Sequence, residues 1–369
     1  MRINRLFVDN YKTLVNFTVD FSQNSILIGP NGSGKSTVIQ VIGILKEFIL
    51  SGRRTEGPDA VFSAETITRW MKTNLQTFEM TISENGHIFI YKLQIEHKSP
   101  KCRVIEETVT CDNKKIFSAG LGKAYLINDA NGKEVEILAD WTLSAVGMVY
   151  EREDNKLLMC FKEAVKKIVI CTPRPDCAKD STGEESDAPS PFAENIVAMH
   201  RHYSQMHPEL VADLISLMHD MNPAFSRVYL NPAGDEKILM VEYRSADAVL
   251  SYRFSELSDG EKMIFELYFL ITIFLKRGYT LLLDEPDNYI SLPEIQPWCQ
   301  LIEEYVEEYG GQCLLISHHK EVIDYFAQNE SLWFKRLQYS ATRVEEAPVL
   351  AEPMTYTDYI IRGGWDAAG

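Results

Sequence analysis

The sequence predicts an α/β fold with a parallel core sheet and an antiparallel β lobe inserted into it. Near the N-terminus, an apolar strand at 25–28 leads through a glycine-rich turn into a helix at 35–50. From 260 to 316 the chain alternates helix, apolar strand, helix and apolar strand, which is typical of a parallel sheet. Between these parts, 78–150 carries short β-type segments separated by Asn-Gly and Asp-Asn turns, which indicate antiparallel hairpins.

The remaining elements follow from shorter patterns. Apolar residues alternate with polar ones in the expected strands and recur every three to four residues in the expected helices. No heptad pattern persists over three or four turns, so we expect no long coiled coil. In chain order, these further elements are strands at 3–8 and 17–21, a helix at 155–167, a strand at 168–170, a short helical insertion at 192–221 and a hairpin at 228–252 that turns at 232–235.

Composition divides the chain further. The stretch 173–191 is rich in Pro, Ser and acidic residues and almost lacks large apolar ones, so we expect a flexible exposed loop. The predicted divisions are an N-terminal lobe (1–172), the acidic loop with the helical insertion and hairpin (173–253), a C-terminal lobe (254–345) and a tail (346–369).

Charge and cysteine usage limit the class of protein. The 369 residues contain 37 Lys and Arg against 53 Asp and Glu, a net charge of −16, which disfavours a uniformly basic nucleic-acid coat. The seven Cys include no Cys-x-x-Cys pair, so neither a disulfide framework nor a zinc site is expected. No signal-peptide pattern or membrane-length apolar run is present, which predicts a cytoplasmic protein without membrane contact.

A phosphate-binding motif joins the first apolar strand to its helix. Residues 29–36, Gly-Pro-Asn-Gly-Ser-Gly-Lys-Ser, match the pattern G-x-x-x-x-G-K-[ST]. Glycines allow backbone N–H groups to surround phosphate oxygens, and the helix N-terminus adds positive charge. Lys35 is expected to reach the β and γ phosphates of ATP, and the Ser36 hydroxyl to ligate Mg²⁺. The predicted ATP-binding residues of this loop are Asn31, Gly32, Ser33, Gly34, Lys35, Ser36 and Thr37.

Two acidic residues end the apolar strand at 280–283. Asp284 and Glu285 stand at its carboxyl end, which is where ligands bind in open α/β sheets. Burial of adjacent carboxylates without a cation is costly. We therefore expect Asp284 to hold Mg²⁺ and Glu285 to polarise a water molecule in line with the γ-phosphate.

Two further patterns flank that strand. Ser258-Asp259-Gly260-Glu261 opens the helix before it and is, by itself, a helix-capping pattern. The apolar strand at 314–316 ends in Ser317 followed by His318 and His319.

These four elements, in this order, resemble the ATP-binding-cassette-type ATPases of the RecF, SMC and overcoming-lysogenization-defect group. Among these, the compact ATPases of bacterial anti-phage and toxin–antitoxin-like operons are most similar. The resemblance implies that Ser258 and Gly260 contact the γ-phosphate of ATP held by an opposite subunit. It also implies that His318, rather than His319, is the switch histidine, and that two chains sandwich two ATP molecules.

Departures from the group limit what is carried over. The group's glutamine loop cannot be placed, because neither Gln76 nor Gln205 follows a strand in a recognisable context. The loop after Pro286 differs from the form that transporter ATPases have. Asp287 and Asn288 are the residues of this loop that we expect near the second nucleotide. No nuclease centre is visible, and Glu345-Glu346 is interpreted as surface.

Three functions are open. The first is a homodimeric ATPase switch acting on a separate effector, a nuclease or toxin, in anti-phage defence. The second is a DNA repair or maintenance ATPase that binds duplex DNA across the dimer. The third, a transporter subunit, is disfavoured by the long insertion between the two motif groups. The basic residues that would support DNA binding are Arg53, Arg54, Lys98, Lys101, Arg103, Lys114, Lys115, Lys166 and Lys167.

Overall fold

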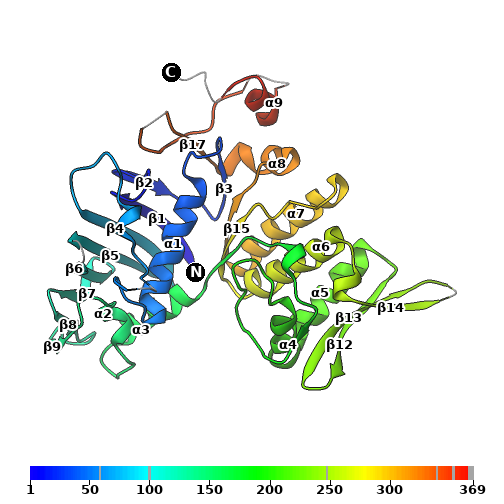
Figure 1. Ribbon diagram of the computed structural model, residues 1–369, viewed down its shortest axis with the longest axis horizontal. Coiled ribbons are helices and arrows are strands. Elements are labelled where there is room, and N and C mark those ends of the chain that lie inside the picture. Colours follow the sequence, from blue (N-terminus) through cyan, green and yellow to red (C-terminus); the bar gives the residue numbers. More distant parts are fainter. Residues whose placement is uncertain (58–59, 99–100, 247, 338–339, 351–353, 365–369) are drawn as a thin grey trace. The chain divides into compact units, whose positions relative to one another are not determined.

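The computed structural model describes residues 1–57, 60–98, 101–246, 248–337, 340–350 and 354–364. The chain divides into two compact units (Figure 1). Unit 1 comprises 1–168, 330–354 and 358–369, and unit 2 comprises 169–329 and 355–357. The predicted domain boundaries at 172, 253 and 345 remain a prediction.

An antiparallel sheet of eight strands forms much of unit 1, in the order β2-β1-β4-β5-β6-β7-β8-β9. Strands β4 to β9 are the predicted β lobe, and β1 and β2 extend its sheet. The β4–β5 and β6–β7 turns lie at the predicted pairs Asn85-Gly86 and Asp112-Asn113. The third predicted pair, Asn131-Gly132, lies in the longer β8–β9 connection, and β7 turns into β8 at Leu121-Gly122, which was not predicted. Alternate residues of β4 are fully buried, as the period of two requires. The strands are β1 (Arg2–Asp9), β2 (Phe17–Asp20), β4 (Leu75–Glu84), β5 (His87–Lys98), β6 (Lys101–Cys111), β7 (Lys114–Gly120), β8 (Lys123–Ile127) and β9 (Glu134–Leu138).

The remaining elements of unit 1 include the strand before the glycine-rich loop and the helix after it. Strand β3 (Asn24–Ile28) is buried at every residue and pairs in parallel with β17 (Ser331–Lys335), which pairs antiparallel with β18 (Arg343–Glu345). Helix α1 (Lys35–Ser51) follows β3 and ends at Gly52, whose φ is 67°. The other elements are the 3₁₀ turn η1 (Ala64–Thr66), α2 (Ala145–Met148) and α3 (Lys156–Lys166).

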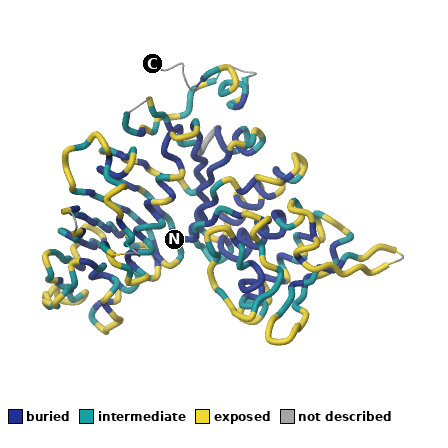
Figure 2. Tube along the Cα trace, in the orientation of Figure 1, coloured by how far each residue is buried: buried dark blue, intermediate teal, exposed yellow. Residues whose placement is uncertain are grey.

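Unit 2 has a parallel core of strands in the order β10-β15-β16. Strands β15 (Thr280–Asp284) and β16 (Gln312–Ile316) pair in parallel and are almost wholly buried (Figure 2). The other elements are β10 (Ile168–Cys171), α6 (Asp259–Leu270), the π-helical η4 (Ile271–Leu275), α7 (Leu292–Tyr309) and α8 (Lys320–Glu330). Among the described residues the longest helix, α7, has 18 residues, in keeping with the absence of a long coiled coil.

The insertion in unit 2 contains more elements than the sequence predicted, in its helices, its acidic stretch and its hairpin. The helical stretch 192–221 is two helices, α4 (Ile196–Met206) and α5 (Pro208–Met221), because a proline favours the first helical position and cannot continue a helix. The acidic stretch 173–191 is not a featureless loop. It contains η2 (Pro175–Cys177) and β11 (Ser181–Thr182), which pairs with β13. The predicted hairpin gains a third strand. Its strands are β12 (Phe225–Ala233), β13 (Glu236–Arg244) and β14 (Val249–Arg253), and they are followed by the 3₁₀ turn η3 (Phe254–Glu256).

The C-terminal segment is partly described. Helix α9 spans Tyr356–Ile361, whereas 351–353 and 365–369 of the predicted tail lie outside the described residues. Glu345 forms an ion pair of 2.6 Å with Lys335 at the end of β18, as suits a surface carboxylate. Within the described ranges, every helix lacks the length or apolar character needed to cross a membrane.

Candidate nucleotide site

The predicted phosphate loop lies between β3 and α1. Gly32 and Gly34 have φ values of 77° and 110°, which L-residues with a Cβ rarely adopt. The Lys35 side chain is buried, and its Nζ donates hydrogen bonds to the carbonyl oxygens of Gly29 (2.7 Å) and Pro30 (3.2 Å). Ser36 is exposed at the start of α1. The loop thus places a lysine and a hydroxyl at a helix N-terminus, where anions bind.

The loop also holds an unsatisfied buried hydroxyl. Ser33 Oγ is inaccessible to solvent and has no hydrogen-bond partner among the residues that the structure describes. A buried polar group without a partner is costly, so a ligand atom at this position would be stabilised. With the exposed N-terminus of α1, this arrangement fits a bound nucleotide phosphate.

A support for the loop comes from the chain after β17 and was missed by the sequence reasoning. Thr342 Oγ1 donates to the carbonyl oxygen of Ser33 (2.8 Å) and lies 2.8 Å from Thr13 Oγ1. Arg336 Nη1 donates to the carbonyl oxygen of Gly32 at 3.3 Å. A Cβ added to Gly34 would lie 2.6 Å from Thr342 Oγ1, so this glycine is also needed for close approach. No motif marks these residues, because they meet the loop only through the pairing of β3 with β17.

In unit 2, Glu285 at the end of β15 lines a pocket. Glu285 has a φ of 52°, and its N–H donates to the carbonyl oxygen of Ile316 at 2.8 Å. Its Oε2 accepts a hydrogen bond from Asn288 Nδ2 (3.2 Å), and its Oε1 lies 4.0 Å from His318 Nε2. Asp284, the preceding residue, is half-buried at the strand end. A left-handed backbone at a non-glycine residue is strained and is common at functional sites.

The pocket itself measures about 370 Å³. Asp287 is buried against it, and within the described ranges its Oδ1 has no hydrogen-bond partner. Burial raises the pKa of the Asp287 carboxyl, although a hydrogen bond from Ser317 opposes this effect. The pocket is lined by Glu285, Asp287, Asn288, Tyr289, Ile290, His318 and His319. Acidic and imidazole groups converge there, as general acid–base or cation-assisted chemistry requires.

The two histidines have different surroundings. His318 is half exposed beside Glu285. His319 Nδ1 accepts a hydrogen bond from the backbone N–H of Glu321 (3.2 Å), close to the first turn of α8. The contact with Glu285 favours His318 as the histidine that meets a nucleotide, and this role stays a prediction.

Ser258 caps α6 as its sequence pattern indicates. Its Oγ accepts a hydrogen bond from the Glu261 N–H (3.3 Å) and donates to Glu261 Oε2 (2.7 Å), which forms a capping box. Gly260 approaches the loop after β15, because an added Cβ would lie 3.1 Å from the Tyr289 carbonyl oxygen. Ser258 is exposed, so its hydroxyl is accessible to a second molecule.

The two glutamines considered for a glutamine loop have other contacts. Gln76 is buried in β4, where it donates to the Asn10 carbonyl oxygen (2.9 Å) and bonds His97. Gln205 on α4 donates to Glu185 Oε1 (2.9 Å).

The N-terminal half of the chain decides the family. Residues 1–185, half of the chain, match the family model described as the AAA ATPase domain. The chain belongs to this family. This AAA ATPase-domain protein matches no curated protein.

Solved structures show the fold of the ATPase-domain protein. The SMC head domain from Thermotoga maritima aligns with a TM-score of 0.50 and 16% identity over 95% of this chain and 100% of that one. A Smc head bound to the C-terminal winged-helix domain of ScpA aligns with a TM-score of 0.58 and 16% identity. That alignment covers 94% of this chain and 98% of the Smc head. The third structure is a Smc head with an extended coiled coil, bound to the C-terminal domain of ScpA derived from Pyrococcus furiosus. It aligns with a TM-score of 0.54 and 12% identity over 93% of this chain and 95% of that one. The predicted fold class is confirmed.

Proposed function

We propose that this protein is an ATP-hydrolysing homodimeric switch that controls a separate effector protein. The observation that carries the proposal is the phosphate loop at the start of α1, where Lys35 and the unpartnered Ser33 hydroxyl line an anion site. Membership of an ATPase family and the fold of SMC heads support it.

Each residue of the proposed site has a stated task. Lys35 and the loop amides bind the phosphates, and the Ser36 hydroxyl and Asp284 carboxylate are oxygen ligands of the kind that Mg²⁺ takes. Bound Mg²⁺ supplies positive charge beside the β and γ phosphates. Glu285 accepts a proton from the attacking water, and His318 donates a hydrogen bond to the γ-phosphate.

The second subunit completes each site in this proposal. Ser258 and Gly260 of the partner subunit contact the γ-phosphate, so ATP binds the closed dimer more tightly than the open chain. A ligand shifts an equilibrium only by such a difference in affinity. ATP therefore closes the dimer and hydrolysis opens it, which allows an effector to be held and released. We place this switch in the cytoplasm and in anti-phage defence, with a nuclease or toxin as its effector, on the resemblance to compact defence ATPases.

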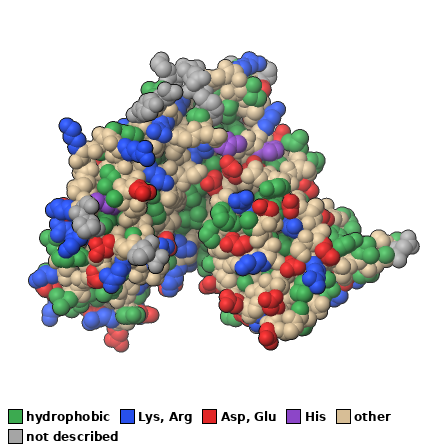
Figure 3. All heavy atoms as spheres, in the orientation of Figure 1, with side chains coloured by type: hydrophobic (Ala, Val, Ile, Leu, Met, Phe, Trp, Pro, Cys, Tyr) green, Lys and Arg blue, Asp and Glu red, His purple; other side chains and the backbone are tan. Residues whose placement is uncertain are grey.

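Most of the basic residues considered for the alternative DNA-binding function are paired with acids. Six of the nine basic residues considered for it form ion pairs with acids of unit 1: Arg53, Arg54, Lys98, Arg103, Lys166 and Lys167. On the face in Figure 3, acidic and basic side chains are interspersed. Phosphate binding needs clustered, available cations, so the effector switch is favoured.

Light scattering coupled to size exclusion tests the switch. Glu285→Gln retains the shape of the side chain but removes the base, so we expect ATP with Mg²⁺ to convert this variant from monomer to stable dimer. The matched control, Glu285→Gln combined with Lys35→Ala, should stay monomeric with ATP. An unchanged mass in the single variant, with ATP bound, would refute the dimer switch while leaving nucleotide binding in place.

A further inference from the structure

A cluster of nitrogen, sulfur and oxygen ligand atoms lies in the β lobe, apart from every nucleotide motif. It consists of His87 at the start of β5, Cys111 at the end of β6 and Asp112 in the turn that follows. One ligand atom from each side chain lies within 4.8 Å of the other two. The sequence gives no hint of this cluster, because His87 and Cys111 are 24 residues apart and match no metal-ligand spacing.

The backbone holds the three residues together. Strands β5 and β6 pair with Phe89 opposite Cys111, so His87 lies just beyond the pairing, beside the β6–β7 turn. The Asp112 N–H donates to the Ile88 carbonyl oxygen, and Asp112 Oδ1 accepts from the Ile88 N–H, both at 2.9 Å. These two bonds fix the carboxylate before any ligand arrives, which lowers the entropic cost of binding.

The other oxygen of that carboxylate, Oδ2, is the centre of the cluster. Asp112 Oδ2 lies 2.7 Å from His87 Nδ1 and 3.6 Å from Cys111 Sγ. Adjacent ligands of a tetrahedral zinc ion lie about 3.3–3.6 Å apart, given the usual bond lengths. The cluster therefore needs only small side-chain rotations to surround one ion.

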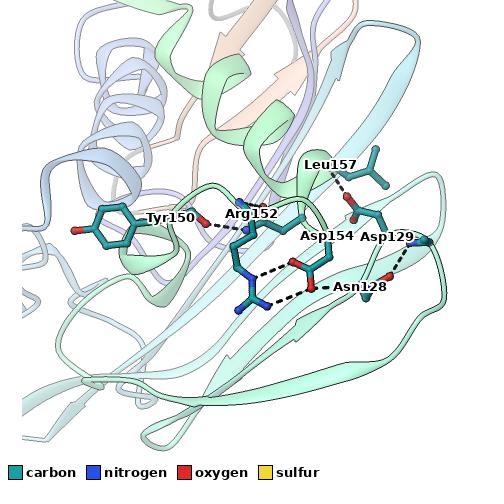
Figure 4. Close-up of polar contacts among 8 residues, drawn as sticks. Asn128, Asp129, Tyr150, Arg152, Asp154 and Leu157 are labelled. Carbon is teal, nitrogen blue, oxygen red and sulfur yellow. Dashed lines mark hydrogen bonds and ion pairs between the residues drawn. The ribbon is translucent and has the colours of Figure 1, made fainter.

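Hydrogen bonds attach the start of the neighbouring helix α3 to the connection between β8 and β9. Figure 4 shows the start of α3, where Asp129 Oδ2 accepts a 2.9 Å hydrogen bond from the Leu157 N–H and Asn128 Nδ2 donates to Asp154 Oδ2. One turn further along α3, Cys160 Sγ accepts a 3.9 Å contact from Asn85 Nδ2. The Cys160 thiol and the Asp129 carboxylate are both near enough to influence Cys111 electrostatically.

We propose that His87 Nδ1, Cys111 Sγ and the Asp112 carboxylate bind one Zn²⁺ ion. Imidazole, thiolate and carboxylate are the ligand set of zinc, and three protein ligands leave a fourth position for solvent. That position is accessible, since the side chains of His87 and Asp112 are 40% and 51% exposed. The ion would tie the β6–β7 turn to the start of β5. This proposal does not depend on the proposed ATPase function.

Cobalt(II) is a spectroscopic probe for such a site. We expect untagged, reduced, full-length protein to bind one Co²⁺ per chain with thiolate-to-cobalt charge-transfer absorption and the strong d–d bands of a tetrahedral ion. Added Zn²⁺ should remove both. A Co²⁺ ion at the nucleotide motifs would give no thiolate band, because those motifs contain no cysteine.

Variants decide the assignment. Cys111→Ser should abolish the charge-transfer band, and His87→Ala, which alters an exposed side chain and should fold, should weaken Co²⁺ binding at least tenfold. Cys102→Ser is the matched control, because Cys102 is buried in the same strand and lies outside the cluster; it should retain the band. Zn²⁺ should raise the unfolding temperature of the wild type and not of Cys111→Ser. Absence of a band in the wild type, or its persistence in both Cys111→Ser and His87→Ala, would overturn the proposal.

Discussion

The hydroxyl of Thr342 donates a 2.8 Å hydrogen bond to the carbonyl oxygen of Ser33, across 309 residues of chain. The interaction joins the segment after β17 to the phosphate loop. It fixes the orientation of the peptide between Ser33 and Gly34.

Thr342→Val should loosen this loop. Valine matches threonine in shape but leaves a buried carbonyl oxygen unpaired, so we expect the unfolding free energy to fall by about 1–3 kcal/mol and ATP affinity to fall several-fold. Denaturant unfolding and titration with a fluorescent ATP analogue measure the two effects. Ser340→Ala, which removes only bonds to the Leu337 and Ala341 carbonyls, should bind ATP normally. Equal affinities for the two variants would contradict a supporting role for Thr342.

Lys35→Ala should weaken ATP binding by about 10- to 100-fold, because a charge-assisted hydrogen bond to phosphate contributes about 1.5–3 kcal/mol. The same titration and a phosphate-release assay measure the loss. The control is Lys46→Ala on the same helix, whose ammonium bonds the Ile168 carbonyl oxygen and which should bind ATP as the wild type does. An ATP hydrolysis rate of Lys35→Ala equal to that of the wild type would contradict the phosphate-loop assignment.

Ser258→Arg should block hydrolysis while leaving ATP binding by the single chain unchanged, because the bulky cation would obstruct a partner's nucleotide. The variant also loses a helix cap, worth about 1 kcal/mol. Ser291→Arg separates these effects, since Ser291 forms the equivalent capping box on α7. We expect Ser291→Arg to lose stability and keep its turnover rate. If Ser258→Arg hydrolyses ATP at the wild-type rate, Ser258 serves only as a helix cap.

His318→Ala should lower the hydrolysis rate by at least about tenfold, since it removes a hydrogen-bond donor from the proposed γ-phosphate site. His319→Ala removes only the acceptor for the Glu321 N–H and should cost about 1 kcal/mol of stability with little change in rate. Single-turnover assays and denaturant unfolding compare the two variants. The opposite pattern would assign the switch role to His319.

Glu266 on α6 makes the stability of unit 2 sensitive to pH. It is fully buried, and both carboxylate oxygens lack partners in the part of the chain that the structure describes. Burial raises its pKa to about 8 from the usual 4.5. The folded state therefore retains a proton that the unfolded chain loses, so stability falls as pH rises from about 4.5 to about 8. At about 1.4 kcal/mol per pKa unit, the loss is on the order of 3–5 kcal/mol.

Glu266→Gln should remove that pH dependence, since the amide stays neutral. We expect the variant to be more stable than the wild type near pH 8.5 and similar to it near pH 5, as measured by urea unfolding. Glu304→Gln, on the exposed face of α7, is the control and should retain the wild-type profile. If the wild type and Glu266→Gln show parallel profiles, the carboxyl is solvated or paired in solution.

Much of the fold was predictable because its signals are local. The helix at 35–50 and the turns at Asn85-Gly86 and Asp112-Asn113 were found within one or two residues, since apolar period and turn chemistry are set by near neighbours. The stretch 192–221 was predicted as one helical insertion because its apolar spacing continues past Pro208, where the backbone is interrupted. The pairing of β11 with β13 was missed because a two-residue strand has no period to detect.

The sequence by itself determined the order of the four motifs, the residue types within them and the class of chemistry they serve. Only the tertiary structure decided which distant groups meet them: Thr342 beneath the phosphate loop, His318 beside Glu285, and His87 next to Cys111 and Asp112. The physical reason is that a motif is read over a few bonded neighbours. Strand pairing and burial, by contrast, place side chains by register and packing, which no local pattern records.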